Sequence, residues 1–310
     1  MFKESFNPNQ ATEKIEKKES VLKNQENMIA LFRRLQNVYE TRPEMKDFVG
    51  AMAGSKFAEE YTPERVNSDL QYVETTRDKI DAYNREKGQE QLDTFEENFA
   101  FAEATQAIIT DRINSWMPEF KTIMTSDYDD LRVGIDMVMK HQDGGYLGTA
   151  FDATVSSHPE KINGKLEKNW DNNTVKGNIP TVKYFQDPDT KEKGRILVPK
   201  FIIGVSANEI NQLAEAYLNQ TESSFDSHPM RMAILDQIKL QISGALTFYE
   251  DSSDPKHYFA KQQYLKLERT IDDAITQLSK SEAVNRLEYH EYRKENLTIN
   301  LIEDFFNKKQ

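Results

Sequence analysis

The segment 126–156 constrains the fold more than any other part of the chain, because its pattern is typical of a β-hairpin. Its sequence, SDYDDLRVGIDMVMKHQDGGYLGTAFDATVS, contains two apolar runs, at residues 133–139 and 146–155. The cluster Asp143-Gly144-Gly145 lies between them, and such clusters favour a tight turn between antiparallel strands. We therefore expect two neighbouring strands in the middle of the chain.

Each of these runs contains one acidic residue among apolar neighbours, Asp136 in the first and Asp152 in the second. A carboxylate within a strand is costly to bury unless it is paired or binds a cation. If the register places both residues on one face, the two carboxylates could bind one ion. Alternatively, the two side chains face solvent or pair with Arg132 and Lys140, and the sequence leaves both interpretations open.

Helical spacing of apolar residues predicts helices at both ends of the chain and strands in its centre. Thr62 and Pro63 begin one helix, and Ser206 with Glu209 forms a capping box at the start of another. The expected helices cover residues 11–40, a short segment after 41–44, 62–87, 90–117, part of 157–173, 207–218, 229–248, 255–278 and 282–306, and the further β-rich runs are 181–185 and 195–205. This order indicates an α+β fold, in which a small mixed sheet of about four strands is flanked by long terminal helices.

We expect three regions along the chain. Residues 1–89 form an N-terminal helical region, 90–225 an α/β core, and 226–310 a C-terminal helical region packed on the core. The alternative is a wholly helical assembly protein, if the central runs are not strands.

Composition excludes several classes of site. The chain has no cysteine, which excludes disulfides, thiolate metal sites and a cysteine nucleophile. Its five histidines lack ligand spacing, so zinc is not expected. No apolar run reaches about 18 residues and the N-terminus lacks the apolar core of a secretion signal, so we expect a cytoplasmic protein without a membrane partner. A net charge of −12 argues against unspecific nucleic-acid binding over the whole surface, although residues 161–200 contain nine Lys/Arg against five Asp/Glu.

The order of a long helix, a strand with a lone Asp, a hairpin partner with a second Asp and a Lys-bearing helix resembles the PD-(D/E)XK nuclease superfamily over about residues 90–220. Asp136 in Gly-Ile-Asp and Asp152 in Asp-Ala-Thr carry the resemblance. It implies a restriction-endonuclease-like core in which these two residues hold Mg²⁺. It also implies a lysine two residues after the second Asp, which helps to position or activate the attacking water, but Thr154 occupies that position.

The resemblance therefore implies a cation from elsewhere, and Lys161 and Lys165 on the following helix are the candidates. It also suggests Asp130 and Glu103 as additional metal ligands. The alternatives without a catalytic role are a solvated helix face for the lysines, and a turn or helix cap for Asp130 and its neighbour Asp129.

Two functions follow from these observations. The first is a divalent-metal-dependent nuclease, active or degraded, with nucleic acid as its substrate. The second is a non-catalytic scaffold whose long acidic helices bind a protein partner. Polar helices with narrow apolar stripes could also form a homo-oligomer in either case.

Overall fold

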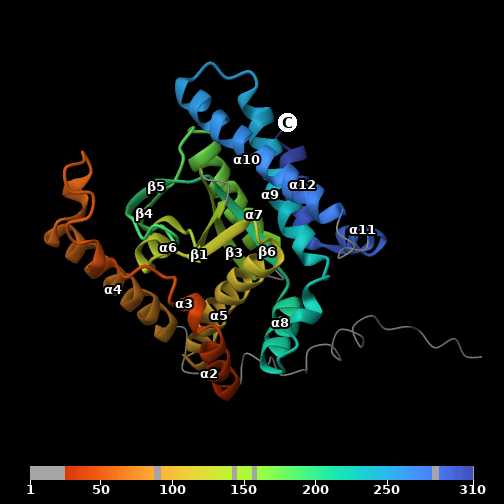
Figure 1. Ribbon diagram of the computed structural model, residues 1–310, viewed down its shortest axis with the longest axis horizontal. Coiled ribbons are helices and arrows are strands. Elements are labelled where there is room, and N and C mark those ends of the chain that lie inside the picture. Colours follow the sequence, from red (N-terminus) through yellow and green to blue (C-terminus); the bar gives the residue numbers. More distant parts are fainter. Residues whose placement is uncertain (1–24, 87–91, 142–144, 156–158, 281–285, 310) are drawn as a thin grey trace, which may run out of the picture.

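A four-stranded mixed sheet lies at the centre of the computed structural model, which describes residues 25–86, 92–141, 145–155, 159–280 and 286–309 (Figure 1). The strands are ordered β1 (Phe120–Met124), β2 (Met137–His141), β3 (Gly145–Val155) and β6 (Lys200–Val205). The first three pair antiparallel, and β3 pairs with β6 in parallel. A separate antiparallel pair joins β4 (Thr181–Gln186) to β5 (Lys193–Leu197). The expected small mixed sheet with flanking helices is confirmed.

Helices account for most of the remaining described chain. They are α2 (Gln25–Arg34), α3 (Gln36–Tyr39), α4 (Pro63–Glu86), α5 (Leu92–Trp116), α6 (Asp127–Val133), α7 (Pro159–Asn169), α8 (Ala207–Leu218), α9 (Met230–Tyr249), α10 (Pro255–Lys280), α11 (Arg286–Glu295) and α12 (Leu297–Asn307). Short 3-10 turns cover Met45–Phe48, Ala58–Tyr61 and Glu222–Phe225, and a π-helical turn, Trp170–Thr174, extends α7. None of the helices in this part of the chain combines the length and apolarity needed to cross a bilayer.

Two local predictions about helix ends are confirmed. The helix α4 begins at Pro63, and Arg65 N donates to Thr62 Oγ1. Both hydrogen bonds of the capping box between Ser206 and Glu209 are present at the start of α8.

Other predicted boundaries are wrong. The first strand of the hairpin begins at Met137 rather than at residue 133, because α6 occupies the preceding segment and ends at Gly134, which has a φ of 69°. The helix expected over 282–306 is interrupted by Asn296, whose side chain accepts a hydrogen bond from Ile299 N and begins a new helix. The run 195–205 forms two strands, β5 and β6, and the short strand β1 was not expected.

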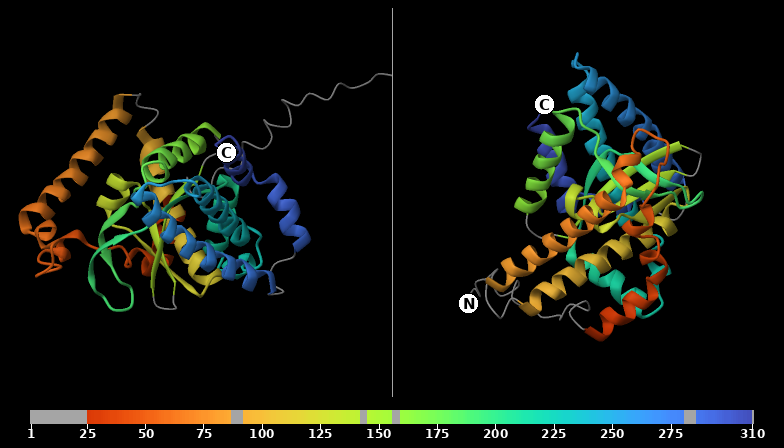
Figure 2. Two further views of the ribbon diagram at one scale, coloured as in Figure 1. Left: turned by 90° about the horizontal axis from the view of Figure 1, so that it is seen from above. Right: turned by 90° about the vertical axis from the view of Figure 1, so that its left-hand side faces the viewer.

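The two faces of the central sheet contact different cores, and helices lie on both sides of it (Figure 2). One face contributes Met137, Met139 and Phe201 to the largest core, which also contains residues of α2, α5, α8, α9 and α10. On the opposite face, Val138 packs against β4 and the end of β5, and Ile202 packs against α7 and α12. The helix α7 therefore covers the side of the sheet that faces away from α5.

At both edges of this sheet, side-chain amides form hydrogen bonds with the outward-facing backbone groups of the outer strands. At the β6 edge, Gln237 and Gln241 of α9 hydrogen-bond to the backbone of Gly204 and Ile202. These bonds satisfy outward-facing backbone groups that would otherwise be buried without partners.

At the opposite edge, Asn114 of α5 accepts a hydrogen bond from Thr122 N and donates one to Thr122 O in β1. The next outward-facing amide, Met124 N, donates to Thr41 Oγ1. Both edges are thus closed by the same kind of contact.

Candidate functional site

Asp136 lies one residue before β2, on the side of the sheet that faces away from α5. Thr125 N donates to Asp136 O at 3.1 Å, which extends the β1–β2 ladder by one pair. Met137 and Met139 face the core that contains α5, whereas Val138 faces the other side. Alternation along the strand places Asp136 on the side of Val138. Since Asp136 is only 6% exposed, the interpretation that it faces solvent is wrong.

The backbone register brings Asp152 to the position opposite Asp136. Met137 of β2 pairs with Phe151 of β3, so the next pair of the antiparallel register is Asp136 with Asp152. Directly opposed residues have Cβ atoms about 4.5–5.5 Å apart and share a face of the sheet. The Asp152 side chain lies outside the described part of the structure.

The positively charged side chain of Lys200 lies on the same side of the sheet. This lysine was not identified as a candidate residue from the sequence. It begins β6, two residues before Ile202, which pairs in parallel with Asp152. Lys200 is partly buried, and its Nζ donates to Val133 O at 3.3 Å. Because Val133 lies three residues before Asp136 and β3 lies between β6 and β2, the lysine side chain extends across β3 towards the start of β2.

The helix α7 places Lys161 and Lys165 on this side as well. Its buried residues Ile162 and Leu166 contact Ile202 of β6. Lys161 is exposed and Lys165 is partly buried. Both lysines therefore belong to the helix that covers the aspartate side of the sheet, and the solvated-face interpretation fits Lys161 better than Lys165.

The helix α12 covers the sheet at the position of Thr154. Thr154 pairs with Gly204 in the parallel register, and its side chain lies outside the described part of the structure. A Cβ atom on Gly204 would lie 2.4 Å from Thr298 Oγ1, which shows how closely α12 approaches β6 here.

Glu103 and Asp130 both interact electrostatically with Arg42. Arg42 Nη1 lies 3.0 Å from Glu103 Oε1 and 2.7 Å from Asp127 Oδ1. Burial lowers the pKa of Arg42, but the carboxylates of Asp127, Glu103 and Asp130 outweigh it and raise that pKa. Glu103 belongs to α5, which packs on the sheet face opposite to Val138, whereas Asp130 belongs to α6, whose Val133 packs on the same face as Val138.

Asp129 has a structural role in the first turn of α6. Its backbone N donates to Ser126 Oγ, so the N-cap of this helix is Ser126, and the interpretation of Asp129 as a cap is wrong. Its fully buried carboxylate accepts hydrogen bonds from Ser126 Oγ at 2.8 Å, Lys183 N at 2.7 Å and Tyr184 N at 2.9 Å. Burial raises the pKa of Asp129 to about 6, although these hydrogen bonds act in the opposite direction. Asp129 thus joins α6 to β4.

The two cations that the sequence suggested as partners for the aspartates contact other groups as well. Lys140 Nζ lies 2.8 Å from Asp187 Oδ2 and 3.0 Å from Asp189 Oδ2 in the β4–β5 turn. The guanidinium of Arg132 lies over the ring of Tyr72, with its Cζ 5.3 Å from the ring centroid. These contacts fasten the second sheet and α4 to the core.

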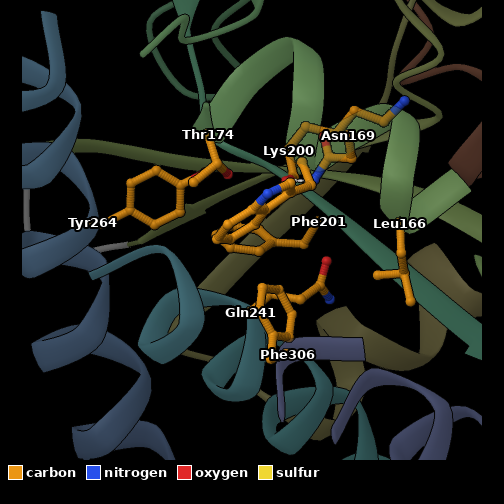
Figure 3. Close-up of a pocket in the computed structure, with 9 residues that line it drawn as sticks. Leu166, Asn169, Thr174, Lys200, Phe201, Gln241, Tyr264 and Phe306 are labelled. Atoms are coloured by element: carbon orange, nitrogen blue, oxygen red, sulfur yellow. Dashed lines mark hydrogen bonds between the residues drawn. The ribbon is translucent and has the colours of Figure 1, made fainter. Parts of the chain in front are cut away.

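Two hollows in the described part of the chain lie away from the Asp136 carboxylate. One cavity of about 10 Å³, lined by Leu166, Lys200, Tyr264 and others, has room for about one water molecule. The side chain of Lys200 extends out of it (Figure 3). A larger pocket of about 380 Å³ lies beyond the carboxyl end of β6, and Ser206 and Tyr292 are among its lining residues. Neither hollow is lined by Asp136, so the candidate site rests on the strand register.

A pair of carboxylates is the kind of ligand set that suits a small hard cation bound by few protein groups. Within the side chains that the structure describes, no group of three or more His, Cys, Asp or Glu residues could hold a metal ion. Mg²⁺ needs fewer protein ligands, because it keeps several waters and binds through one or two carboxylates together with substrate phosphates.

No protein-family model matches the chain, and no curated protein or solved structure shows significant similarity to it.

Proposed function

We propose that this chain is a divalent-metal-dependent nuclease, in which Asp136 and Asp152 hold Mg²⁺. The observation that carries the proposal is the pairing of Met137 with Phe151, because continuing this register by one residue would set Asp136 opposite Asp152. Asp136 is almost fully buried, and binding a cation is one way in which a buried carboxylate is stabilised. A metal ion bound there lowers the pKa of a coordinated water and stabilises the charge that develops on the phosphate.

Lys200 is our candidate for the role that the resemblance assigns to a lysine at position 154. Its Nζ lies at the segment leading into β2, on the same side of the sheet as Asp136. There it can hold the attacking water in position and offset negative charge on the substrate phosphate. Lys165 on α7 is the second candidate for this role, since it is partly buried on the same side.

A second candidate function is the non-catalytic scaffold. The observation in its favour is that Asp136 is almost fully buried and lines neither of the two hollows described above. In that case Lys200 neutralises the strand aspartates permanently, and the nuclease-like core supports helices that bind a protein partner.

A metal titration by calorimetry separates the two functions. We expect Mg²⁺ or Mn²⁺ to bind the wild-type protein and not the variants Asp136→Asn or Asp152→Asn, which keep the side-chain shape but remove the charge. The control is Asp78→Asn, because Asp78 is an exposed aspartate on α4. Absence of binding at millimolar metal, with and without an oligonucleotide, would remove the nuclease proposal.

Variants of Lys200 test the assignment of the cation. Lys200→Met should leave metal binding in place and lower the rate of nucleic-acid cleavage by about 10²-fold or more, because a preorganised electrostatic contact is lost. The parallel variant Lys165→Met identifies which lysine is used. If Lys200→Met cleaves at the wild-type rate, Lys200 has no catalytic role.

A further inference from the structure

A cluster of exposed aromatic and apolar side chains lies at the start of α10. Tyr258 is 67% exposed, Phe259 is 48% exposed, and Val175 from the turn after α7 is 41% exposed. The first turn of α10 lies at the periphery of the molecule, at the top of Figure 1. Clusters of exposed aromatic side chains commonly mark binding surfaces.

The turn after α7 is held directly against this part of α10. The ring of His257 hydrogen-bonds through Nε2 to Val175 O at 2.9 Å. A Cβ atom on Gly177 would lie 2.6 Å from His257 Cδ2 and 3.0 Å from Lys256 Cβ. The exposed Lys176 is therefore fixed close to the exposed Lys256, at the foot of the aromatic pair.

Positive charge accompanies these rings along the helix. Residues 255–269 contain four basic residues, Lys256, Lys261, Lys266 and Arg269, and one acidic residue, Glu268, whereas the exposed Glu250, Asp251 and Asp254 immediately precede the helix. The chain as a whole has a net charge of −12. Spacings of seven and three residues place Phe259, Lys266 and Arg269 along one exposed stripe of α10. We call Val175, Lys176 and these exposed residues of α10 the aromatic–basic face.

The opposite side of the helix is anchored in the core. His257, Ala260 and Tyr264 are buried, and the ring of Tyr264 packs edge-on against Phe201 of β6 at a centroid distance of 6.0 Å. The exposed rings thus project from a fixed element rather than from a loop, so little conformational entropy is lost when a ligand stacks on them.

We propose that the aromatic–basic face binds the single-stranded nucleic acid that the site acts on. Unpaired bases stack on the rings of Tyr258 and Phe259, and the lysine and arginine side chains contact the phosphates. A duplex hides its base faces, and the exposed Lys266 and Arg269 on the stripe of Phe259 favour contact with the phosphates of a single strand. This inference rests on the proposed function, and it specifies the form of the substrate.

The path from this face to the candidate site follows α7. The chain runs from Lys161 and Lys165 along α7, through the π-helical turn Trp170–Thr174, and directly into Val175. The side chain of Asn169, at the end of α7, donates to Lys200 O at 3.0 Å. One continuous helical segment therefore connects the aromatic–basic face with the strand that carries Lys200.

The test measures fluorescence anisotropy of a labelled 20-nucleotide oligo-dT or oligo-U with the full chain, in EDTA at low salt. The double variant Tyr258→Ala/Phe259→Ala should bind at least about tenfold more weakly, because each stacked base contributes strongly to affinity. The variant Tyr258→Phe should retain wild-type affinity. Leu287→Ala is the matched control, since Leu287 is 71% exposed on α11. Lys256→Gln/Lys266→Gln should weaken binding and flatten its salt dependence.

The outcomes separate this inference from the proposed function. Binding in EDTA needs neither metal nor catalysis, so loss of binding in the aromatic variant without any cleavage by the wild type would support the face and remove the nuclease. Equal affinity of the wild type and the aromatic variant, preference for a matched duplex, or loss of self-association in place of nucleic-acid binding, measured by sedimentation, would each overturn the inference.

Discussion

The side-chain amide of Gln237 forms two hydrogen bonds with the backbone of Gly204. Gly204 N donates to Gln237 Oε1 at 2.8 Å, and Gln237 Nε2 donates to Gly204 O at 3.0 Å. Gln241 makes the same pair of bonds with Ile202, both at 2.9 Å. Four residues of helix rise about 6 Å and two residues of strand about 6.6 Å, so one turn of α9 matches the repeat of outward-facing groups on β6.

Gln237→Ala should therefore be strongly destabilising. It leaves a buried backbone N–H and C=O of Gly204 without partners, and we expect the free energy of unfolding to fall by about 2–4 kcal/mol. Urea denaturation followed by circular dichroism measures the change. Gln262→Ala, at an exposed position on α10, is the control and should have almost no effect. A loss as small as the control's would mean that water replaces the amide.

Gly204→Ala should destabilise the protein through a steric clash with α12. The new Cβ would lie 2.4 Å from Thr298 Oγ1 and 2.5 Å from Thr298 Cγ2, and such overpacking costs about 1–3 kcal/mol. In a double-mutant cycle, Thr298→Ala should recover part of this loss. Additive effects of the two substitutions would show that α12 moves away as a unit instead.

The buried Asp129 should make stability depend on pH in an unusual direction. Its pKa is raised by burial from 3.8 to about 6, so the folded state binds the proton more tightly than the unfolded state does. The contribution of Asp129 to the free energy of unfolding is greatest below pH 4 and decreases as pH rises towards 6. The stability difference between wild type and Asp129→Asn, measured by denaturation at pH 4, 5, 6 and 7, should show this slope. A difference that is constant with pH would place the pKa near its ordinary value.

Glu103→Gln should lower stability without affecting metal binding. The substitution weakens the ion pair with Arg42, whose Nη1 lies 3.0 Å from Glu103 Oε1, and we expect a loss of about 1–2 kcal/mol. Calorimetric titration with Mn²⁺ should give the wild-type affinity, in contrast to Asp136→Asn. Weaker metal binding by Glu103→Gln would return this residue to the ligand set.

Local signals in the sequence predicted much of the helical structure. Ser206 with Glu209, and Thr62 with Pro63, mark helix starts because a cap depends on residues within one turn of each other. The break at Asn296 was missed, because asparagine also occurs within helices, and only its hydrogen bond to the amide of residue 299 reveals a new start.

The candidate site was predictable only in part. Asp136 was recognisable as an isolated acidic residue in an apolar run, and the turn between the runs indicated its partner Asp152. Lys200 was not recognisable, because 64 residues separate it from Asp136 and no local pattern connects them. Only the parallel pairing of β3 with β6 brings that lysine alongside, and parallel strand order follows from the packing of the intervening helix rather than from the strands themselves.

The amide contacts at both sheet edges limit how this protein can associate. Strands at an open edge act as templates on which another chain can polymerise, through strand exchange, peptide addition or fibril growth. With Asn114 occupying the backbone of Thr122 at one edge, and Gln237 and Gln241 occupying β6 at the other, those routes are blocked in the folded state. A peptide or a second copy that adds a strand to the central sheet would first have to displace these side chains.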